Sequence, residues 1–280
     1  MLKTLKEKFE SAFDVPFTSA YGLNSHDLWY DIGPKSNMKE YFKLHLQFVN
    51  DIRLTMELVP DEYSVPFIAD MSRASEEKKR IFTSFAHRFI GKRAKVSFSI
   101  NHAPADSVDY SDWAMDWSHV GLRISRSPIT NDYINHEAII LDWGIPMMGM
   151  VLSLANIVPL EPAIKLGVTE GTVHRELTNR YERSPINRTL CLFMKGYNCS
   201  VCGMNFKDKY GDLGFNYIHV HHSHPVSQMG DNYLVDPATE LYPVCPNCHA
   251  MLHRRNPPLS IEELKRMLAS TSEGQFGGKD

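Results

Sequence analysis

The sequence predicts an α+β protein with an N-terminal mixed α/β domain and a smaller C-terminal domain that is stabilised by metal. In the first half, segments with apolar residues at helical spacing precede segments in which apolar and polar residues alternate. In the last third, two Cys-x-x-Cys pairs flank a histidine-rich segment. A chain of 280 residues with 43% apolar content is long enough for two domains with packed cores.

The domain boundaries follow from a change in composition between about Val158 and Ser184. This stretch holds several prolines and glycines and a charged run, which indicate a connecting segment. We therefore expect an N-terminal domain at residues 1–160, a linker at 161–184, a C-terminal domain at 185–270 and a disordered glycine-rich tail at 271–280.

The N-terminal domain is expected to begin with helices and to continue with strands. Apolar residues at helical spacing predict helices at Leu2–Phe13, Met38–Phe48 and Glu76–Ile90. Ser75 is a suitable N-cap for the third helix. Alternation predicts strands at Val96–Ile100, Leu122–Ile124 and Ala138–Leu141.

Two other segments of this domain each allow two interpretations. Trp113 and Trp117 lie among acidic residues and could stack on a nucleic-acid base, but core packing is favoured because large aromatic residues dominate protein cores. The basic run Gly91–Lys95 could contact phosphates, and a solvated turn between a helix and a strand explains it equally well.

The C-terminal domain is expected to begin with a short helix. Ser184 and Pro185 suit the N-cap and the first helical position, and Gly196 suits the end of a helix that finishes at Lys195. Cys191, the one cysteine outside the two pairs, is interpreted as a packing residue of this helix.

A strand and two more helices are expected to follow. Alternation over Tyr217–His222 predicts the strand, and the second cysteine pair leads into a helix that Pro257 must end. Ser260 and Glu263 have the spacing of a capping box and begin the final helix.

The overall charge argues weakly against a nucleic-acid partner. A net charge of −3 differs from that of a typical basic DNA-binding domain. Binding depends on local clusters, however, and a solvated surface is the alternative use of each basic residue. The arginines that could form such a cluster are Arg175, Arg180, Arg183, Arg188, Arg254 and Arg255.

The sequence predicts a cytoplasmic protein without membrane contact. The first residues lack the apolar region of a secretory signal, and no uninterrupted apolar stretch approaches the roughly 20 residues that cross a bilayer. Four of the five cysteines have metal-ligand spacing, which suits a reducing compartment.

The cysteine pairs predict a structural zinc site. Cys199, Cys202, Cys245 and Cys248 supply four thiolates, and tetrahedral Zn²⁺ with four sulfur ligands leaves no position for a substrate. Buried free thiols are the alternative, but packing seldom produces paired Cys-x-x-Cys spacing.

The histidines predict a second cation site. His249 and His253 lie one helical turn apart, and His221 could join them from the end of the strand. Such a site suits Mg²⁺, Mn²⁺ or another divalent ion and leaves positions for water and a phosphate oxygen. Ordinary hydrogen-bonded histidines are the alternative, and for His219 and His224 that alternative is favoured.

The C-terminal third resembles the HNH, or ββα-metal, nucleases, in particular the McrA-like branch found in restriction endonucleases. The resemblance extends from about Gly171 to Leu268. It is carried by the motifs Tyr181–Pro185, Gly196–Cys202, Tyr210-Gly211, Val220-His221-His222, Asp236-Pro237 and Leu241–His249.

The resemblance implies a metal-dependent endonuclease that hydrolyses phosphodiester bonds in double-stranded DNA. His222 would be the general base that takes a proton from water, and His221, His249 and His253 would hold the divalent ion. The products would carry 5′-phosphate and 3′-hydroxyl ends. A restriction enzyme is expected, with residues 1–160 as its specificity domain, and it could depend on modified bases. The expected DNA contacts are Arg183, Arg188, Arg254 and Arg255.

One position departs from the family pattern. Glu240 stands where the family usually has the Asn that braces the loop aiming the base, and a carboxylate can accept backbone N–H bonds but cannot donate as an amide does. We expect Glu240 to substitute for the Asn as this brace and to belong to the catalytic site with His222. The departure also supports a catalytically inactive zinc-stabilised binding module as an alternative. A second alternative is a housekeeping nuclease that acts on RNA or damaged DNA. A homodimer is also expected to be compatible with the protein's cutting both DNA strands.

Overall fold

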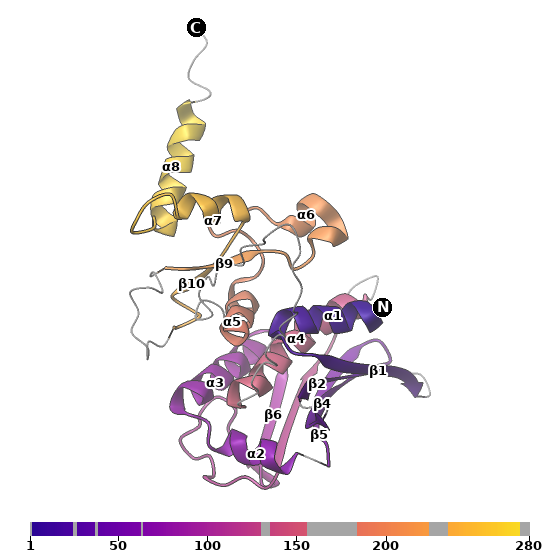
Figure 1. Ribbon diagram of the computed structural model, residues 1–280. Helices are drawn as coiled ribbons and strands as arrows, with labels where there is room; N and C mark the ends of the chain where they lie inside the picture. Colours follow the sequence, from indigo (N-terminus) through magenta and orange to yellow (C-terminus); the bar gives the residue numbers. More distant parts are fainter. Residues whose placement is uncertain are drawn as a thin grey trace, which may run out of the picture. The chain divides into compact units, whose positions relative to one another are not determined.

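The computed structural model describes residues 2–24, 27–36, 39–62, 64–129, 135–155, 184–223 and 235–274. The chain divides into two compact units, Met1–Glu176 and Leu177–Asp280, whose elements are shown in Figure 1. The expected linker lies outside the described residues except for Ser184. The final helix extends through Gly274, so of the expected tail only residues 275–280 lie outside the described part.

The N-terminal unit is built on an eight-stranded antiparallel sheet with the order β1-β2-β4-β5-β8-β6-β7, in which β3 pairs with β2. Its strands are β1 (Phe17–Asn24), β2 (Asp27–Ser36), β3 (Lys39–Glu40), β4 (Phe42–Val49), β5 (Arg53–Pro60), β6 (Lys95–Ile100), β7 (Ala103–Ala105) and β8 (Val120–Arg126). Its helices are α1 (Leu2–Phe13), α2 (Val65–Ser72), α3 (Glu76–Gly91) and α4 (His136–Leu154).

One face of this sheet forms the core. Helices α1, α3 and α4 contact strands β1, β6 and β4 respectively. Along β4, every second residue is buried and the residues between are half-buried, as expected for a strand with one covered face. The largest buried side chains on β4 and α3 are Phe42, Leu44, Leu46, Phe48, Phe82, Phe85 and Phe89.

Helix α4 is apolar on all sides. It is the one described helix that is long and apolar enough to cross a membrane, by length and composition alone. In the N-terminal unit, however, 67% of its most apolar window is buried, and a helix that is hydrophobic all round is equally typical of a protein core. Its packing against α1, α2 and α3 accounts for this burial.

Several predicted elements are confirmed in this unit. Helix α1 matches the first predicted helix, and α3 begins after Ser75, whose side chain accepts a hydrogen bond from the Lys78 backbone N–H at 3.4 Å. Strands β6 and β8 contain the two strands predicted around Phe98 and Leu122.

Two predictions were wrong. The described part of the predicted helix Met38–Phe48, residues 39–48, forms β3 and most of β4 instead, because the apolar residues of β4 also repeat every second position and that face of the sheet packs in the core. The segment Ala138–Leu141 lies inside α4, which begins after Asn135, whose side chain accepts a hydrogen bond from the Ala138 backbone N–H at 3.0 Å.

The two indoles serve the core, as favoured from the sequence. Trp113 and Trp117 are 8% and 6% exposed and pack around Phe98 with ring centroids 5.0 and 6.0 Å away. Their indole N–H groups donate to the carbonyls of Asp106 and Ala114, both at 2.7 Å. Neither ring is available to stack on a base.

The C-terminal unit is small and has its own core. Its elements are α5 (Pro185–Lys195), α6 (Phe206–Tyr210), the 3-10 helix η1 (Gly211–Gly214), β9 (His219–His222), β10 (Leu241–Val244), α7 (Pro246–Leu252) and α8 (Ile261–Gly274). Strands β9 and β10 pair antiparallel, with His222 opposite Leu241. The core combines apolar residues, including Ile218, Val244 and Leu252, with three buried cysteines.

The helix limits predicted for this unit are largely confirmed. The Ser184 side chain accepts from the Asn187 N–H at 3.3 Å, and Gly196 ends α5 with a φ of 78°. Ser260 and Glu263 form the reciprocal bonds of a capping box. Helix α7 ends at Leu252, earlier than the predicted limit at Pro257.

Candidate metal centres

Four cysteine sulfurs converge in the C-terminal unit. The Sγ atoms of Cys199, Cys202, Cys245 and Cys248 all lie within 4.8 Å of one another. Cys202 and Cys245 are 3.8 Å apart at sulfur, far longer than the roughly 2.05 Å of a disulfide. Two pairs distant in the sequence therefore form one compact set of sulfur atoms, and this set fits a tetrahedral zinc ion.

Backbone turns place the first pair. The Cys199 N–H donates to the Met204 carbonyl at 2.9 Å, and the Gly203 N–H donates to the Cys199 carbonyl at 2.9 Å. Gly203 has a φ of 75°, a left-handed conformation that glycine adopts without strain. The Ser200 N–H donates to the Pro243 carbonyl at 2.7 Å, which ties this turn to β10.

The start of α7 places the second pair. Cys245 is the N-cap of the helix, and its Sγ accepts a hydrogen bond from the Cys248 N–H at 3.4 Å. Burial raises the pKa of Cys248, so its thiolate is unfavourable without a nearby cation. A divalent ion would supply that charge, which agrees with the predicted zinc site.

Three histidines form a second cluster beside the hairpin. His221 comes from β9, His249 from α7, and His253 caps the end of α7. One ring nitrogen of each lies within 4.8 Å of the others, and the ring centroids are 5.0 to 5.4 Å apart. The His253 N–H donates to the His249 carbonyl at 3.3 Å, which keeps the two side chains one helical turn apart.

His221 has the properties of a ligand. It is 2% exposed, and its Nδ1 atom has no hydrogen-bond partner among the described residues. Burial and the neighbouring His253 and His249 lower the pKa of His221 to about 3, so the imidazole is neutral near pH 7. A neutral imidazole with a buried, unsatisfied nitrogen fits a divalent cation at this position.

His222 lies outside the three-histidine cluster. It follows His221 on β9, and successive side chains of a strand point to opposite faces. His222 is half-buried. The strand thus separates this imidazole from the set that could hold a cation.

Glu240 closes the turn before β10. Its carboxylate accepts a hydrogen bond from the Asp236 N–H at 2.6 Å, and its own N–H donates to the Asp236 carbonyl at 2.9 Å. Its carbonyl accepts from the N–H of Ser223, the residue after His222, at 2.8 Å. Glu240 therefore links the turn at Asp236 to the chain immediately after His222 through hydrogen bonds to backbone groups.

A contact of His219 was missed from the sequence. Its Nδ1 lies 3.2 Å from Nδ1 of His249, which connects it to the three-histidine cluster. The available signal was the strand itself, because His219 and His221 are two residues apart and share one face. His224 lies outside the described residues.

The arginines proposed as DNA contacts are not equivalent. Arg254 and Arg255 are exposed directly after His253. Arg188 is half-buried and donates from Nη2 to the Ile218 carbonyl at 2.9 Å, so it also supports the fold. Arg183, like Arg175 and Arg180, lies outside the described residues.

Cys191 is a packing residue, as the sequence predicted. Its thiol is fully buried and donates to the Leu241 carbonyl at 3.4 Å. Burial raises the pKa of Cys191 to about 11, so it stays protonated near neutral pH. It belongs to neither metal-type cluster.

The comparison with known families agrees with this geometry. The family model described as HNH endonuclease matches residues 199–255. The match includes all seven residues of the two clusters and lies in the C-terminal unit, which is similar to HNH endonucleases over this segment. Searches of curated proteins and of solved structures give no match.

The three-histidine cluster predicts a divalent-ion site distinct from the cysteines. We expect zinc-loaded protein to bind Mn²⁺, and His249→Ala to weaken that binding at least about tenfold, because even partners outside the coordination shell contribute that much. Electron paramagnetic resonance of free Mn²⁺ measures the affinity. His87→Ala, an exposed histidine of α3, is the control, and equal Mn²⁺ affinity in both variants would exclude His249 as a ligand.

Proposed function

We propose that this protein is a metal-dependent DNA endonuclease. The observation that carries the proposal is the three-histidine cluster, whose buried His221 Nδ1 lacks a partner among the described residues, inside a segment matched to HNH endonucleases. The cysteine cluster supports it because a unit this small gains folding free energy from a structural metal.

Phosphodiester hydrolysis needs a nucleophilic water and stabilisation of negative charge. A bound divalent ion supplies the counter-charge for the phosphate and for the leaving 3′-oxygen. His221, His249 and His253 would hold that ion. His222 would accept a proton from the attacking water, since an imidazole titrates near neutrality. The proposed products carry 5′-phosphate and 3′-hydroxyl ends.

The separation of the histidines supports these roles. An imidazole whose lone pair binds a metal cannot accept a proton at the same nitrogen. His222 leaves β9 on the face opposite His221 and is not in the three-histidine cluster. Glu240 would act as a positioning residue, because it holds the chain immediately after His222 through its contact with Ser223.

Double-stranded DNA is the proposed substrate. Arg254 and Arg255 are exposed beside His253, where they would meet phosphates flanking the cleaved bond. Arg188 and Arg183 complete the proposed contacts of this domain. We further propose that residues 1–160 form a specificity domain and residues 185–270 the nuclease domain. We also propose that the protein is cytoplasmic and cuts both strands as a homodimer.

The finer proposal is a McrA-like restriction enzyme, including one that depends on modified bases. We expect cleavage of at least one plasmid from a set that is unmodified, cytosine-methylated, hydroxymethylated or adenine-methylated, in Mg²⁺ or Mn²⁺. Gel analysis would resolve nicked and linear products. Cleavage of a single modified plasmid would establish modification dependence, and equal cleavage of all four would exclude it.

Glu240 favours a second candidate, a zinc-stabilised nucleic-acid-binding module without cleavage. Its carboxylate accepts one backbone N–H but cannot donate as the usual Asn would. Retention of DNA by folded, zinc-loaded protein without nicking in any divalent ion would support this candidate over the nuclease. Cleavage of RNA or damaged DNA alone would instead indicate a housekeeping nuclease.

A further inference from the structure

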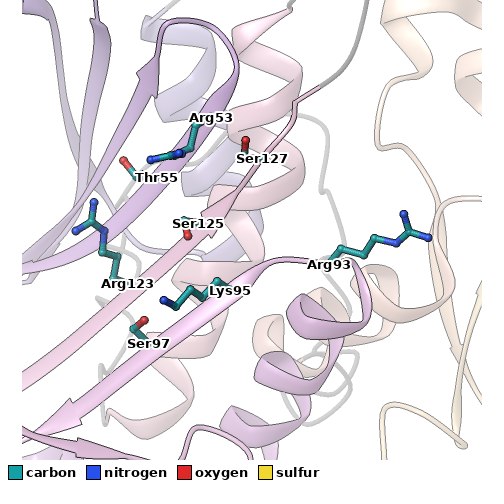
Figure 2. Close-up of a pocket in the computed structure, with 8 residues that line it drawn as sticks. All are labelled: Arg53, Thr55, Arg93, Lys95, Ser97, Arg123, Ser125 and Ser127. Atoms are coloured by element: carbon teal, nitrogen blue, oxygen red, sulfur yellow. The ribbon is translucent and has the colours of Figure 1, made fainter.

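The sheet of the N-terminal unit has a basic depression on its open face. The depression has a volume of about 480 Å³, and no acidic residue lines it. Its lining, shown in Figure 2, consists of Arg53, Thr55, Arg93, Lys95, Ser97, Arg123, Ser125 and Ser127. Four cations and four hydroxyl groups therefore gather on one surface of a chain whose net charge is −3.

Strand register brings these residues together. On the central strand β8, Ser125 pairs with Thr55 of β5 on one side and with Lys95 of β6 on the other. Arg123 pairs with Ser97 of β6. Paired residues point to the same face, and neighbouring strands are about 4.8 Å apart. The basic and hydroxyl groups of three strands thus form one continuous surface.

The sheet face opposite the helices carries polar side chains that are exposed to solvent. Arg53, Lys95 and Arg123 are exposed, whereas the residues beside them on the same strands, such as Leu54 and Ile124, are buried under the helices. Alternation of this kind is expected where one face packs on a core and the other meets solvent.

Among the described residues, no ion pair joins a cation of the depression to an acidic side chain. Across the described part of the chain, the ion pairs involve other residues, and Lys43, on the same face, is paired with Asp31. Glu57 lies opposite Arg123 in the strand register but does not line the depression. Unpaired like charges held on adjacent strands repel one another, and a bound anion would relieve that repulsion.

The edge of the depression is also held in place. Arg93 has a φ of 61°, in the left-handed region, and its carbonyl accepts a hydrogen bond from Nη1 of Arg126 at 3.2 Å. Figure 2 shows the Arg93 side chain extending to one side, away from Arg53, Lys95 and Arg123. The positive surface is therefore wider than a site for one small anion.

We propose that this surface, named here the basic face and defined by Arg53, Arg93, Lys95 and Arg123, binds the phosphate backbone of duplex DNA. The proposal rests on the nuclease function for the identity of the polyanion. Cations and hydroxyl donors distributed over a surface can bind successive phosphates of a duplex. Such contacts position the DNA without reading its sequence. The basic face would thus hold DNA in the N-terminal unit while the HNH domain cuts it.

Two double variants with equal charge loss test the basic face. Arg53→Gln/Arg123→Gln removes two of its cations, and Arg73→Gln/Arg80→Gln removes two exposed arginines of helical segments in the same unit. Each pair is introduced into full-length His222→Ala protein, and binding to a fluorescent duplex is measured by anisotropy over a range of salt concentrations. Circular dichroism establishes that both proteins are folded.

The expected result is specific to the basic face. Its variant should bind duplex DNA about tenfold more weakly at moderate salt, and the slope of log K against log salt should fall by about 2, since each phosphate contact contributes about 0.9. The control variant should change binding less than about twofold. Lys95→Gln/Arg123→Gln should repeat the effect, and Arg123→Lys should largely keep the affinity.

Other outcomes overturn the proposal. Equal weakening in both double variants would indicate a general charge effect, and unchanged binding in both would exclude the basic face. Binding that depends on these cations for duplex RNA but not for duplex DNA would identify a different partner. Failure of the nuclease proposal is distinguishable, because wild-type protein would then cleave no plasmid while DNA binding still depended on the basic face.

Discussion

Replacing His222 with alanine is expected to reduce DNA cleavage by a factor of about 10² to 10⁴, the usual contribution of a positioned general base. His222 sits at the end of β9, outside the three-histidine cluster, so its loss should remove a proton acceptor and leave the metal ligands in place. Cleavage rates under single-turnover conditions, with Mn²⁺ affinity and zinc content measured in parallel, separate these effects.

His222→Gln is the matched variant for this experiment. Glutamine can still form hydrogen bonds from the end of β9 but cannot accept a proton near neutral pH. Both variants should keep the wild-type unfolding temperature and Mn²⁺ affinity while losing cleavage. If folded His222→Ala protein cleaves at the wild-type rate, another group activates the water and the proposed mechanism is wrong.

The metal-type residues were accessible from the sequence because their geometry is largely local. A Cys-x-x-Cys turn brings two sulfurs together whatever the rest of the fold, and His249 and His253 share a helix face through four-residue spacing. The contact between His219 and His249 was less visible, since it requires both the strand direction and the packing of α7 on β9.

The N-terminal sheet was harder to predict, because short apolar segments can fit two periods. Met38, Phe42 and Leu46 repeat every four residues as in a helix, while Phe42, Leu44 and Leu46 repeat every second residue as in a strand. Only pairing of this segment with β2 and β5 decides between them. Local propensity gives way to tertiary context in such cases.

The basic face could not be assembled from the sequence for the same reason. Arg53, Lys95 and Arg123 are far apart in the chain and meet only because β8 lies between β5 and β6. The run Gly91–Lys95 forms one edge of this surface. From the sequence alone, a phosphate contact and a plain turn explained this run equally well. Strand order, which no local pattern encodes, determines the charge distribution on this face.

Replacing Cys199 or Cys248 with serine is expected to unfold the C-terminal unit. Structural zinc contributes about 10–16 kcal/mol of apparent binding free energy in small domains, which is comparable to the roughly 5–15 kcal/mol that stabilises a typical protein. Both cysteines lie in the core of this unit beside Val244 and Leu252, so losing the ion also exposes apolar surface. Zinc content, thermal unfolding and limited proteolysis would measure the loss.

Cys191→Ser provides the control, because it makes the same chemical change at a buried cysteine that ligates nothing. The Cys191 thiol donates to the Leu241 carbonyl, and a serine hydroxyl can replace that donor. This variant should keep its zinc and its resistance to protease, whereas Cys199→Ser should lose both in the C-terminal unit while the N-terminal unit stays protected. Full zinc occupancy and unchanged unfolding in Cys199→Ser would mean that the four sulfurs do not form a structural metal site.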